Sequence, residues 1–318
     1  MEKINMEKKL LVSASPHIRD HISTRRIMLD VVIALAPAAL LGIYYHGLRA
    51  ALLIAVCIVS CVLFEYIAVR IRKKPASIGD CSAIVTGLLL AMSLPPGLPV
   101  WMAVLGCFIA IVIIKQLFGG IGQNFVNPAV GARVFLTVSF AQAMTTWVEP
   151  GTDVISTATP LAIMKDAEAV SAMPDFLDMF LGNIGGCIGE TSAIALILGG
   201  IYLLARTVIT WHIPVFYLGT VAFLTWMLGG NGLFTGDPFT HLIAGGLLLG
   251  AIFMATDYTT SPMTKKGAII FAVGCGLVTS VIRLYGALPE GVAFSILFMN
   301  MLVPLIDRYT IPKNFGGR

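Results

Sequence analysis

Charge is scarce in this sequence. Asp, Glu, Lys and Arg make up 12% of the 318 residues, whereas a soluble domain carries about 25%. Hydrophobic residues make up 57%, and the mean hydropathy is +0.89. These values exclude an ordinary soluble protein and predict a polytopic protein in the lipid bilayer. The net charge is +4, but basic residues of membrane proteins mark cytoplasmic loops, so the charge does not support nucleic-acid binding.

Patterns for metal and nucleotide sites are also missing. None of the six cysteines forms a Cys-x-x-Cys pair, and no Cys/His spacing of the zinc type occurs. Cys57 and Cys61 share a helical face and could in principle hold a metal, although free buried cysteine is the commoner state. His17 and His21 fit an amphipathic surface helix or a partner contact. Because no dinucleotide fingerprint or iron–sulfur motif is present either, we do not expect a complete reaction from this chain alone.

Long apolar runs dominate what is present. A transmembrane helix needs about 20 mostly apolar residues, and ten candidate spans can be marked. They cover residues 27–46, 48–69, 80–94, 99–117, 125–143, 184–205, 212–228, 239–255, 266–284 and 289–306. The third, seventh and eighth are short and contain or adjoin Gly, Pro or polar residues, which indicates tilted or broken helices packed inside the protein. The predicted fold is all-α, with about ten transmembrane helices.

The distribution of the 21 Lys and Arg residues predicts the orientation. With a cytoplasmic N-terminus, only Arg49, Lys165 and Arg283 fall on the outer side, and Arg133 lies within a span. This bias favours two cytoplasmic termini. The expected parts are a cytoplasmic head (1–26), a first five-helix half (27–143), an acidic external loop (144–183), a second five-helix half (184–306) and a cytoplasmic tail (307–318).

A short repeat suggests internal symmetry. The tetrapeptide GLLL occurs at 87–90 in the third span and at 246–249 in the eighth, the corresponding position if each half has five helices. Because five is odd, the second half would be inverted relative to the first, and inverted repeats commonly build a site near the bilayer midplane. GLLL is frequent in membrane proteins, so chance recurrence is the alternative.

A small polar segment, DVISTATPL at 153–161, interrupts the apolar background. Asp, Ser and Thr are helix-capping residues and Pro160 suits a first helical turn, so one interpretation is the start of a helix. The other is a modification site, because an exposed loop with Ala158 as a small neighbour would leave the Thr159 hydroxyl reachable. The residues alone leave both interpretations open.

The same segment contains D-x-x-S-x-A-T, which resembles the flavinylation motif of bacterial redox-pump subunits. The resemblance to the RnfD/NqrB family extends over nearly the whole chain. It is carried by SPHIRDHISTRRIMLDV at 15–31, GDCSAIVTGLLLAMSLPP at 79–96, FGGIGQNFVNPAVGARVF at 118–135, STATPL at 156–161 and ATDYTTSPMTKKG at 255–267. The chain is more similar to the membrane subunits of Rnf ferredoxin:NAD oxidoreductases than to those of sodium-pumping NADH:quinone oxidoreductases, which are longer at the N-terminus.

The resemblance implies a covalent flavin. In this family a flavin transferase attaches FMN through its phosphate to the last threonine of the motif, which is Thr159 here. The other motif positions are Asp153, Ser156, Thr157 and Ala158. Thr157 stands where related motifs often have Gly. The departure is mild because threonine is also small and polar, although it could slow the modification.

The resemblance also implies a second, non-covalent flavin, riboflavin or FMN, within the membrane part. Its candidate walls are the glycine-rich turn at 119–128 and the equivalent polar segment of the second half. A glycine-rich backbone can present N–H groups to a phosphate, although a tight cytoplasmic turn is the simpler interpretation. The implied partners are other Rnf subunits that carry iron–sulfur centres and flavins.

Ionisable residues at bilayer depth are costly and point to function. Glu190, in GETSAIA, and Asp257, in ATDYTTSP, are candidates for an ion path or for polar contacts within the bundle, since sodium prefers hard oxygen ligands. Asp30 and Asp307 lie near span ends, where we expect them to reach water. Glu65 has basic residues close by in sequence, at 70–73.

Two functions are compatible with these features. One is a flavin-carrying electron-transfer subunit of a pump in the bacterial cytoplasmic membrane, which couples ferredoxin:NAD oxidoreduction to Na+ or H+ translocation. The other is a solute channel or transporter of the urea-channel architecture, which the family is thought to share and which needs no cofactor. An exposed, modifiable Thr159 on the outer face separates the two, because a channel has no use for it.

Overall fold

The computed structural model describes residues 23–73, 78–147, 159–165, 174–182, 184–190, 192–230, 232–288 and 290–312. Within these ranges every regular element is a helix, which confirms the predicted all-α class. Three helices are long and apolar enough to cross a membrane: α1 (Thr24–Ile71), α12 (Lys265–Tyr285) and α13 (Val292–Thr310). Shorter apolar helices cover Ser82–Met92, Val100–Gln116, Pro128–Ser139, Ala193–Ala205 and His212–Leu228.

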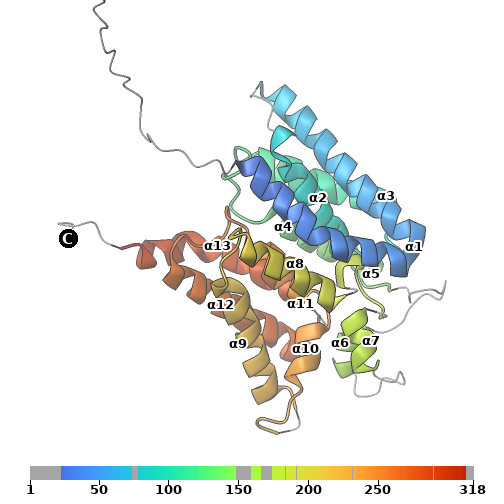
Figure 1. Cartoon of the computed structure of the whole chain (residues 1–318), viewed down its shortest axis with the longest axis vertical. Coiled ribbons are helices and arrows are strands. Elements are labelled where there is room, and N and C mark those ends of the chain that lie inside the picture. The colour runs from blue at the N-terminus through green and yellow to red at the C-terminus, as the bar shows by residue number, and fades with distance from the viewer. Residues whose placement is uncertain are drawn as a thin grey trace, which may run out of the picture.

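The helix α1 consists of two arms. Gly47 has φ +67° and ψ −152°, a backbone conformation that glycine adopts without a steric penalty, and the chain reverses direction there. The arms match the expected spans 27–46 and 48–69, and Figure 1 shows them as two blue helices that meet at the α1 elbow.

The remaining elements follow in the order of the expected spans. In the first half they are η1 (Ile78–Asp80), α2 (Ser82–Met92), α3 (Val100–Phe108), the π-helix η2 (Ile109–Gln116), α4 (Pro128–Ser139) and α5 (Ala141–Met144). The short helices α6 (Pro160–Lys165) and α7 (Phe176–Leu181) lie between the halves. Then come η3 (Ile188–Glu190), α8 (Ala193–Ala205), α9 (His212–Leu228), α10 (Pro238–Ile243), α11 (Leu247–Leu249), the π-helix η4 (Gly250–Met254), α12 and α13.

Local chemistry explains several helix starts. Asn127 precedes α4, and its Oδ1 accepts hydrogen bonds from the backbone N–H groups of Ala129 and Val130. Pro128 follows at the first helical position, where a missing N–H has no cost. Asp237 and Pro238 repeat this arrangement at α10. These caps satisfy N–H groups that lack a partner in the first turn of any helix.

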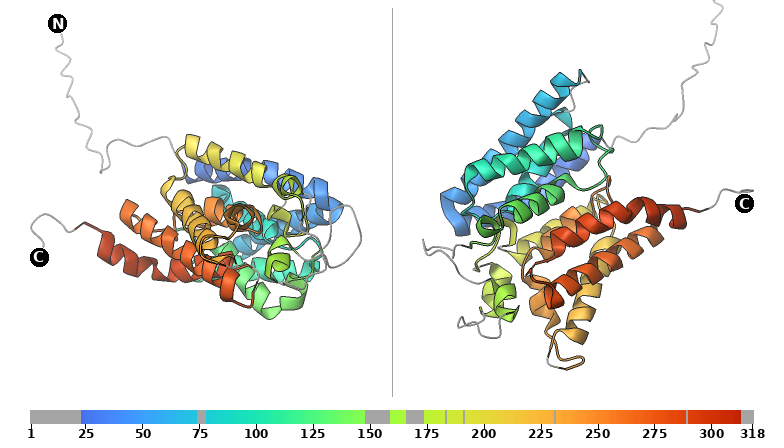
Figure 2. Two further views of the ribbon diagram at one scale, coloured as in Figure 1. Left: turned by 90° about the horizontal axis from the view of Figure 1, so that it is seen from below. Right: turned by 180° about the vertical axis from the view of Figure 1, so that it is seen from behind.

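The two halves share one apolar core. Buried side chains from α1, α2 and α4 form one cluster with those of α8, α12 and α13. Helix α1 packs against α8, where Gly199 leaves room for the backbone carbonyl of Ala34, and α4 packs against α13. Figure 2 shows the blue-to-green helices and the yellow-to-red helices as two adjoining groups.

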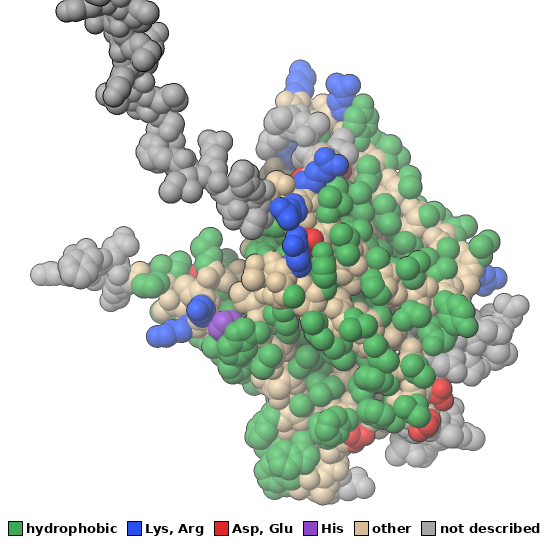
Figure 3. All heavy atoms as spheres, in the orientation of Figure 1, with side chains coloured by type: hydrophobic (Ala, Val, Ile, Leu, Met, Phe, Trp, Pro, Cys, Tyr) green, Lys and Arg blue, Asp and Glu red, His purple; other side chains and the backbone are tan. Residues whose placement is uncertain are grey.

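The surface is divided by side-chain type. Large apolar side chains such as Leu40, Val59, Ile201 and Leu277 are exposed along the sides, as expected where lipid replaces water. Figure 3 shows most of the visible Lys and Arg side chains near the end at which α1 begins, and Asp and Glu side chains toward α7 and α10. The molecule therefore has a basic end and an acidic end separated by an apolar belt.

Candidate functional site

A cavity with about 80 Å³ of enclosed space lies between the two halves. Its walls are apolar side chains such as Ile27, Leu89, Leu203 and Phe253, with the polar side chains of Ser82, Thr86, Lys115, Asn124, Asn127 and Asp257 among them. Small-molecule sites typically have volumes of about 300–1,000 Å³ and a mostly apolar lining with a few placed polar groups. The cavity has this kind of lining, while its volume is below that range.

Two polar segments far apart in the sequence meet at this cavity. Asn124 Nδ2 donates to Thr259 Oγ1 at 3.1 Å, and Asn127 Nδ2 donates to the backbone carbonyl of Met254 at 3.1 Å. These contacts join the glycine-rich turn of the first half to the segment after η4 in the second half. The family resemblance implied the glycine-rich turn and an equivalent polar segment of the second half as walls of one site. The turn and residues 256–259 of the second half both line this cavity.

The turn after η2 needs its glycines. Gly119, Gly120 and Gly122 have φ angles of +137°, +107° and +85°, values at which a side chain is strained. The Gly120 N–H bonds to the backbone carbonyl of Lys115 at 3.0 Å, which closes the turn on the end of η2. The tight-turn interpretation is therefore correct for its first part, while Ile121, Asn124 and the residues that follow extend to the cavity wall.

A buried ion pair forms one side of the cavity. Lys115 Nζ lies 2.9 Å from Glu65 Oε1, and the two side chains are only 3% and 1% exposed. Lys115 Nζ also donates to Ser82 Oγ at 2.6 Å, and Gln116 Nε2 donates to Glu65 Oε1 at 3.0 Å. Direct contact between the two opposite charges offsets part of the free-energy cost of burying them.

Asp257 lies at the same cavity. Its Oδ2 accepts hydrogen bonds from Thr259 Oγ1 at 2.9 Å and from Thr260 Oγ1 at 3.1 Å. These bonds hold the carboxyl group in the turn that follows η4. The sequence left an ion path or polar contacts open for Asp257, and the structure shows the polar contacts.

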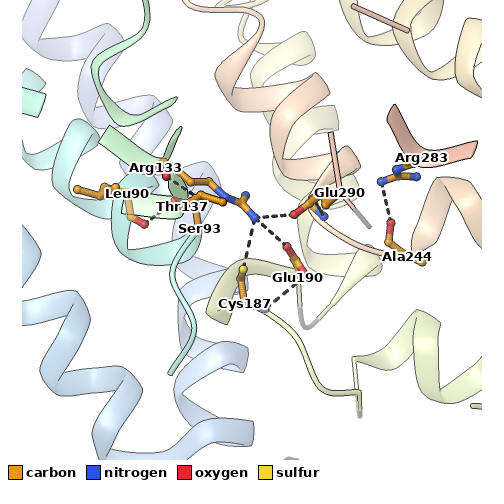
Figure 4. Close-up of polar contacts among 10 residues, drawn as sticks. Leu90, Ser93, Arg133, Thr137, Cys187, Glu190, Ala244, Arg283 and Glu290 are labelled. Carbon is orange, nitrogen blue, oxygen red and sulfur yellow. Dashed lines mark hydrogen bonds and ion pairs between the residues drawn. The ribbon is translucent and has the colours of Figure 1, made fainter. Parts of the chain in front are cut away.

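A second polar cluster lies toward the acidic end. Arg133 Nη2, from α4, is 2.5 Å from Glu290 Oε2 and 3.5 Å from Glu190 Oε1. The same nitrogen donates to Cys187 Sγ at 3.5 Å, and the Cys187 N–H donates to Glu190 Oε2 at 3.3 Å. Figure 4 shows Arg133 between the two glutamates. One guanidinium from the first half therefore binds two carboxyl groups from the second.

The backbone at Gly245 and Gly246 completes this cluster. Glu290 Oε1 accepts a hydrogen bond of 2.5 Å from the Gly246 N–H. Arg283 binds the backbone carbonyls of His241 and Ala244, which anchors the end of α10. The cluster thus fixes the break between α10 and α11 against α4, α12 and the start of α13.

Thr159 lies at the start of α6. Its Oγ1 accepts a hydrogen bond from the Ala162 N–H at 3.2 Å, and the residue is 8% exposed. The helix-start interpretation of the polar segment is therefore correct at this position. The exposure expected for a modification site is not present, because α6 is packed against the body of the protein. Asp153, Ser156, Thr157 and Ala158 lie outside the described residues.

The structure corrects the expectations for two carboxylates. Asp30 is 8% exposed and accepts a hydrogen bond from Tyr202 OH at 2.9 Å, so it is buried instead of facing water. Asp307 is half-buried and accepts a hydrogen bond from the Met263 N–H. Glu65 pairs with Lys115 from η2.

Sequence reasoning missed Glu290 as well as the Glu65–Lys115 pair. The available signal was an isolated charge inside or beside an apolar run, which marks a candidate but not its partner.

These observations define the class of protein: a polytopic helical membrane protein with a partly polar cavity between its two halves and buried charge pairs on either side of the core. The sequence profile of the NQR2, RnfD, RnfE family matches residues 11–316. The chain belongs to this family.

Named relatives match over nearly their whole length. The chain is 50% identical to the RnfD subunit of the Na+-translocating ferredoxin:NAD+ oxidoreductase complex of Acetobacterium woodii, with 98% of this chain and 96% of the relative covered. It is 48% identical to the corresponding subunit of the proton-translocating ferredoxin:NAD+ oxidoreductase complex of Clostridium ljungdahlii, with both chains fully covered. It is 38% identical to the corresponding subunit of an ion-translocating oxidoreductase complex of Halorhodospira halophila, with 95% and 94% covered.

Proposed function

We propose that this chain is a flavin-carrying electron-transfer subunit of an ion-translocating ferredoxin:NAD oxidoreductase complex in the bacterial cytoplasmic membrane. Similarity to RnfD subunits over almost the full chain supports the assignment. The subunit relays electrons between partner subunits and completes no reaction alone. Relatives named for Na+ and for protons have nearly equal identity, so similarity does not select the ion.

The cavity is the proposed site of the non-covalent flavin, riboflavin or FMN, and its geometry is the observation that carries the proposal. Its mostly apolar lining suits the faces of a planar aromatic ring, and Asn124, Asn127 and Lys115 supply hydrogen-bond donors for the polar edge of such a ring. A flavin ring needs more room than the enclosed space of about 80 Å³, so its binding requires the walls to move apart. A bound flavin supplies the redox chemistry. The protein holds the ring, keeps water away from it and sets the local field through Lys115 and Asp257.

The covalent FMN is proposed at Thr159, as a phosphoester within the motif that also includes Asp153, Ser156, Thr157 and Ala158. A flavin transferase is the required maturation partner. The proposed orientation has both termini in the cytoplasm and the flavin-bearing segment on the outer face. The basic end near the start of α1 and the acidic end near α7 support this orientation.

A ten-helix fold of two inverted repeats, resembling urea transporters, is proposed for the membrane part. Asp80 accepts a bond from the Ser82 N–H at the start of α2, and Asp237 accepts one from the Phe239 N–H at the start of α10. Each aspartate precedes a GLLL sequence. Each half also buries a cation at the end of a helix, Lys115 in η2 and Arg283 in α12. These parallels support two related halves.

Glu190 and Asp257 are proposed as separate points on the ion path. Asp257 lies at the cavity and Glu190 lies in the cluster with Arg133, so the two do not form one site. Glu190 is only 7% exposed, and the Asp257 carboxylate lies in a turn where it accepts a hydrogen bond from the Thr259 hydroxyl. Both environments support a role within the membrane. A solute channel without redox function is not favoured, because the relatives are named as oxidoreductase subunits.

The proposed function is tested by asking whether flavin is covalently attached to Thr159. The chain is produced with and without the transferase, and the denatured band is examined for flavin fluorescence and by mass spectrometry of the peptide that contains Thr159. We expect fluorescence only with the transferase, its loss in Thr159→Ala and its retention in Thr145→Ala, a matched variant at an exposed threonine. An unmodified Thr159 peptide from cells that contain the transferase would favour the channel.

A further inference from the structure

Helix α6 is held to the body of the protein at both of its ends. Near its start, Pro160 and Leu161 are buried, and Leu161 is 6% exposed. Leu161 Cδ1 rests on the backbone of Gly245, where an added Cβ would lie 2.7 Å from it. At its end, Lys165 Nζ donates to the backbone carbonyl of Leu288 at 2.8 Å. These two contacts define the docked position of α6.

The docked position hides the hydroxyl of Thr159. The residue is 8% exposed, and its Oγ1 accepts the hydrogen bond from the Ala162 N–H. The Thr159 backbone carbonyl accepts a bond of 3.0 Å from the Ile163 N–H, so the residue is part of the first helical turn. An enzyme that modifies this oxygen must bring its own active site around it, and the docked helix leaves no room for that.

We propose that α6 must leave its docked position before the flavin transferase can modify Thr159, so that docking controls the modification. The inference rests on the proposed function of Thr159 as the flavin acceptor. Short segments held by few contacts open locally at low free-energy cost, and among the described residues the six-residue helix α6 has an apolar anchor at Leu161 and a polar anchor at Lys165. Undocking therefore requires no unfolding of the core.

On the undocked segment, the transfer of FMN to Thr159 conserves atoms and electrons. The donor is a flavin adenine dinucleotide, and Thr159 Oγ attacks its flavin-side phosphorus. An Oγ–P bond forms, the pyrophosphate P–O bond breaks, and adenosine monophosphate leaves with the electron pair. The hydroxyl proton passes to a base of the transferase, and nothing is oxidised or reduced.

The experiment measures the initial rate of flavin transfer to purified, unmodified full-length chain in nanodiscs, with purified transferase and flavin adenine dinucleotide. Leu161→Ala removes the apolar anchor and Lys165→Gln removes the polar one. We expect Leu161→Ala to accelerate transfer roughly tenfold, which corresponds to about 1.4 kcal/mol of docking free energy, and Lys165→Gln to accelerate it by a smaller factor. Leu177→Ala, on α7 with a side chain 62% exposed, is the matched control and should leave the rate unchanged.

Limited trypsin digestion supplies the second readout. Cleavage after Lys165 reports undocking, and we expect it to rise in Leu161→Ala by the same factor as the transfer rate, with α12 and α13 still intact. Equal transfer rates in wild type, Leu161→Ala and Lys165→Gln would overturn the inference, as would acceleration accompanied by digestion of the whole chain. If no variant accepts flavin, the proposed function fails instead, which is a distinguishable result.

Discussion

Replacing Lys115 by methionine separates the structural role of the buried ion pair from its role at the cavity. The Lys115 side chain is 3% exposed and its partner Glu65 is 1% exposed, with 2.9 Å between Nζ and Oε1. Lys115→Met keeps the length of the side chain but removes the ammonium that lies against the buried Glu65 carboxylate. Breaking a buried pair in this way costs about 3–5 kcal/mol.

The double variant Glu65→Gln/Lys115→Met tests that reasoning. Replacing both charges is often nearly neutral, because the cost of desolvating two ions is also removed. We expect its stability to return to within about 1–2 kcal/mol of wild type. The second substitution should therefore restore about 2–3 kcal/mol of the stability that Lys115→Met loses.

Thermal unfolding of the chain in nanodiscs is the assay. At roughly 2–4 °C for each kcal/mol, Lys115→Met should lower the midpoint by about 10 °C, and the double variant should recover most of that loss. Riboflavin binding is measured on the same samples and should be weakened equally in both, since each lacks the Lys115 ammonium at the cavity wall. A double variant as unstable as Lys115→Met, or a Lys115→Met protein as stable as wild type, would refute the pairing argument.

Two further predictions concern close packing and buried hydroxyls. Gly246→Ala should lower the thermal stability of the protein, because the new Cβ would lie 2.7 Å from Glu290 Oε1 and displace that carboxylate from its bond to the Gly246 N–H. Gly219→Ala meets no atom within 4 Å and should stabilise α9 by up to about 1 kcal/mol. Tyr217→Phe removes the hydrogen bond of 2.7 Å between Tyr217 OH and Thr279 Oγ1, while Thr279 keeps its bond to Ser295 Oγ. The variant should therefore lose about 1 kcal/mol of thermal stability. A loss above about 3 kcal/mol would contradict this local account.

The helices were predictable because the apolar runs are long and their boundaries carry specific signals. Asn127 with Pro128, and Asp237 with Pro238, mark the starts of α4 and α10 where the structure places them. Gly47 separates the two arms of α1 between two apolar runs that the sequence already divides. The two walls of the cavity were also named from sequence, through resemblance to a family.

The pairing of charges was not predictable. Lys115 lies 50 positions from Glu65, and Arg133 lies 157 positions from Glu290. A helix that is apolar on all sides gives no periodic signal for the face that turns inward, so the sequence does not indicate which helices pack together. The docked position of α6, which hides Thr159, depends on the same long-range packing.

The sequence by itself determined a bundle of apolar helices with a basic and an acidic end and a family-typical threonine segment, because hydropathy, capping and motif spacing act over short stretches of chain. Only the tertiary structure decided which carboxylates meet which cations, where the cavity closes and whether the Thr159 hydroxyl is reachable. Those features depend on the close approach of segments up to 176 residues apart, and that approach is set by side-chain packing across the whole bundle.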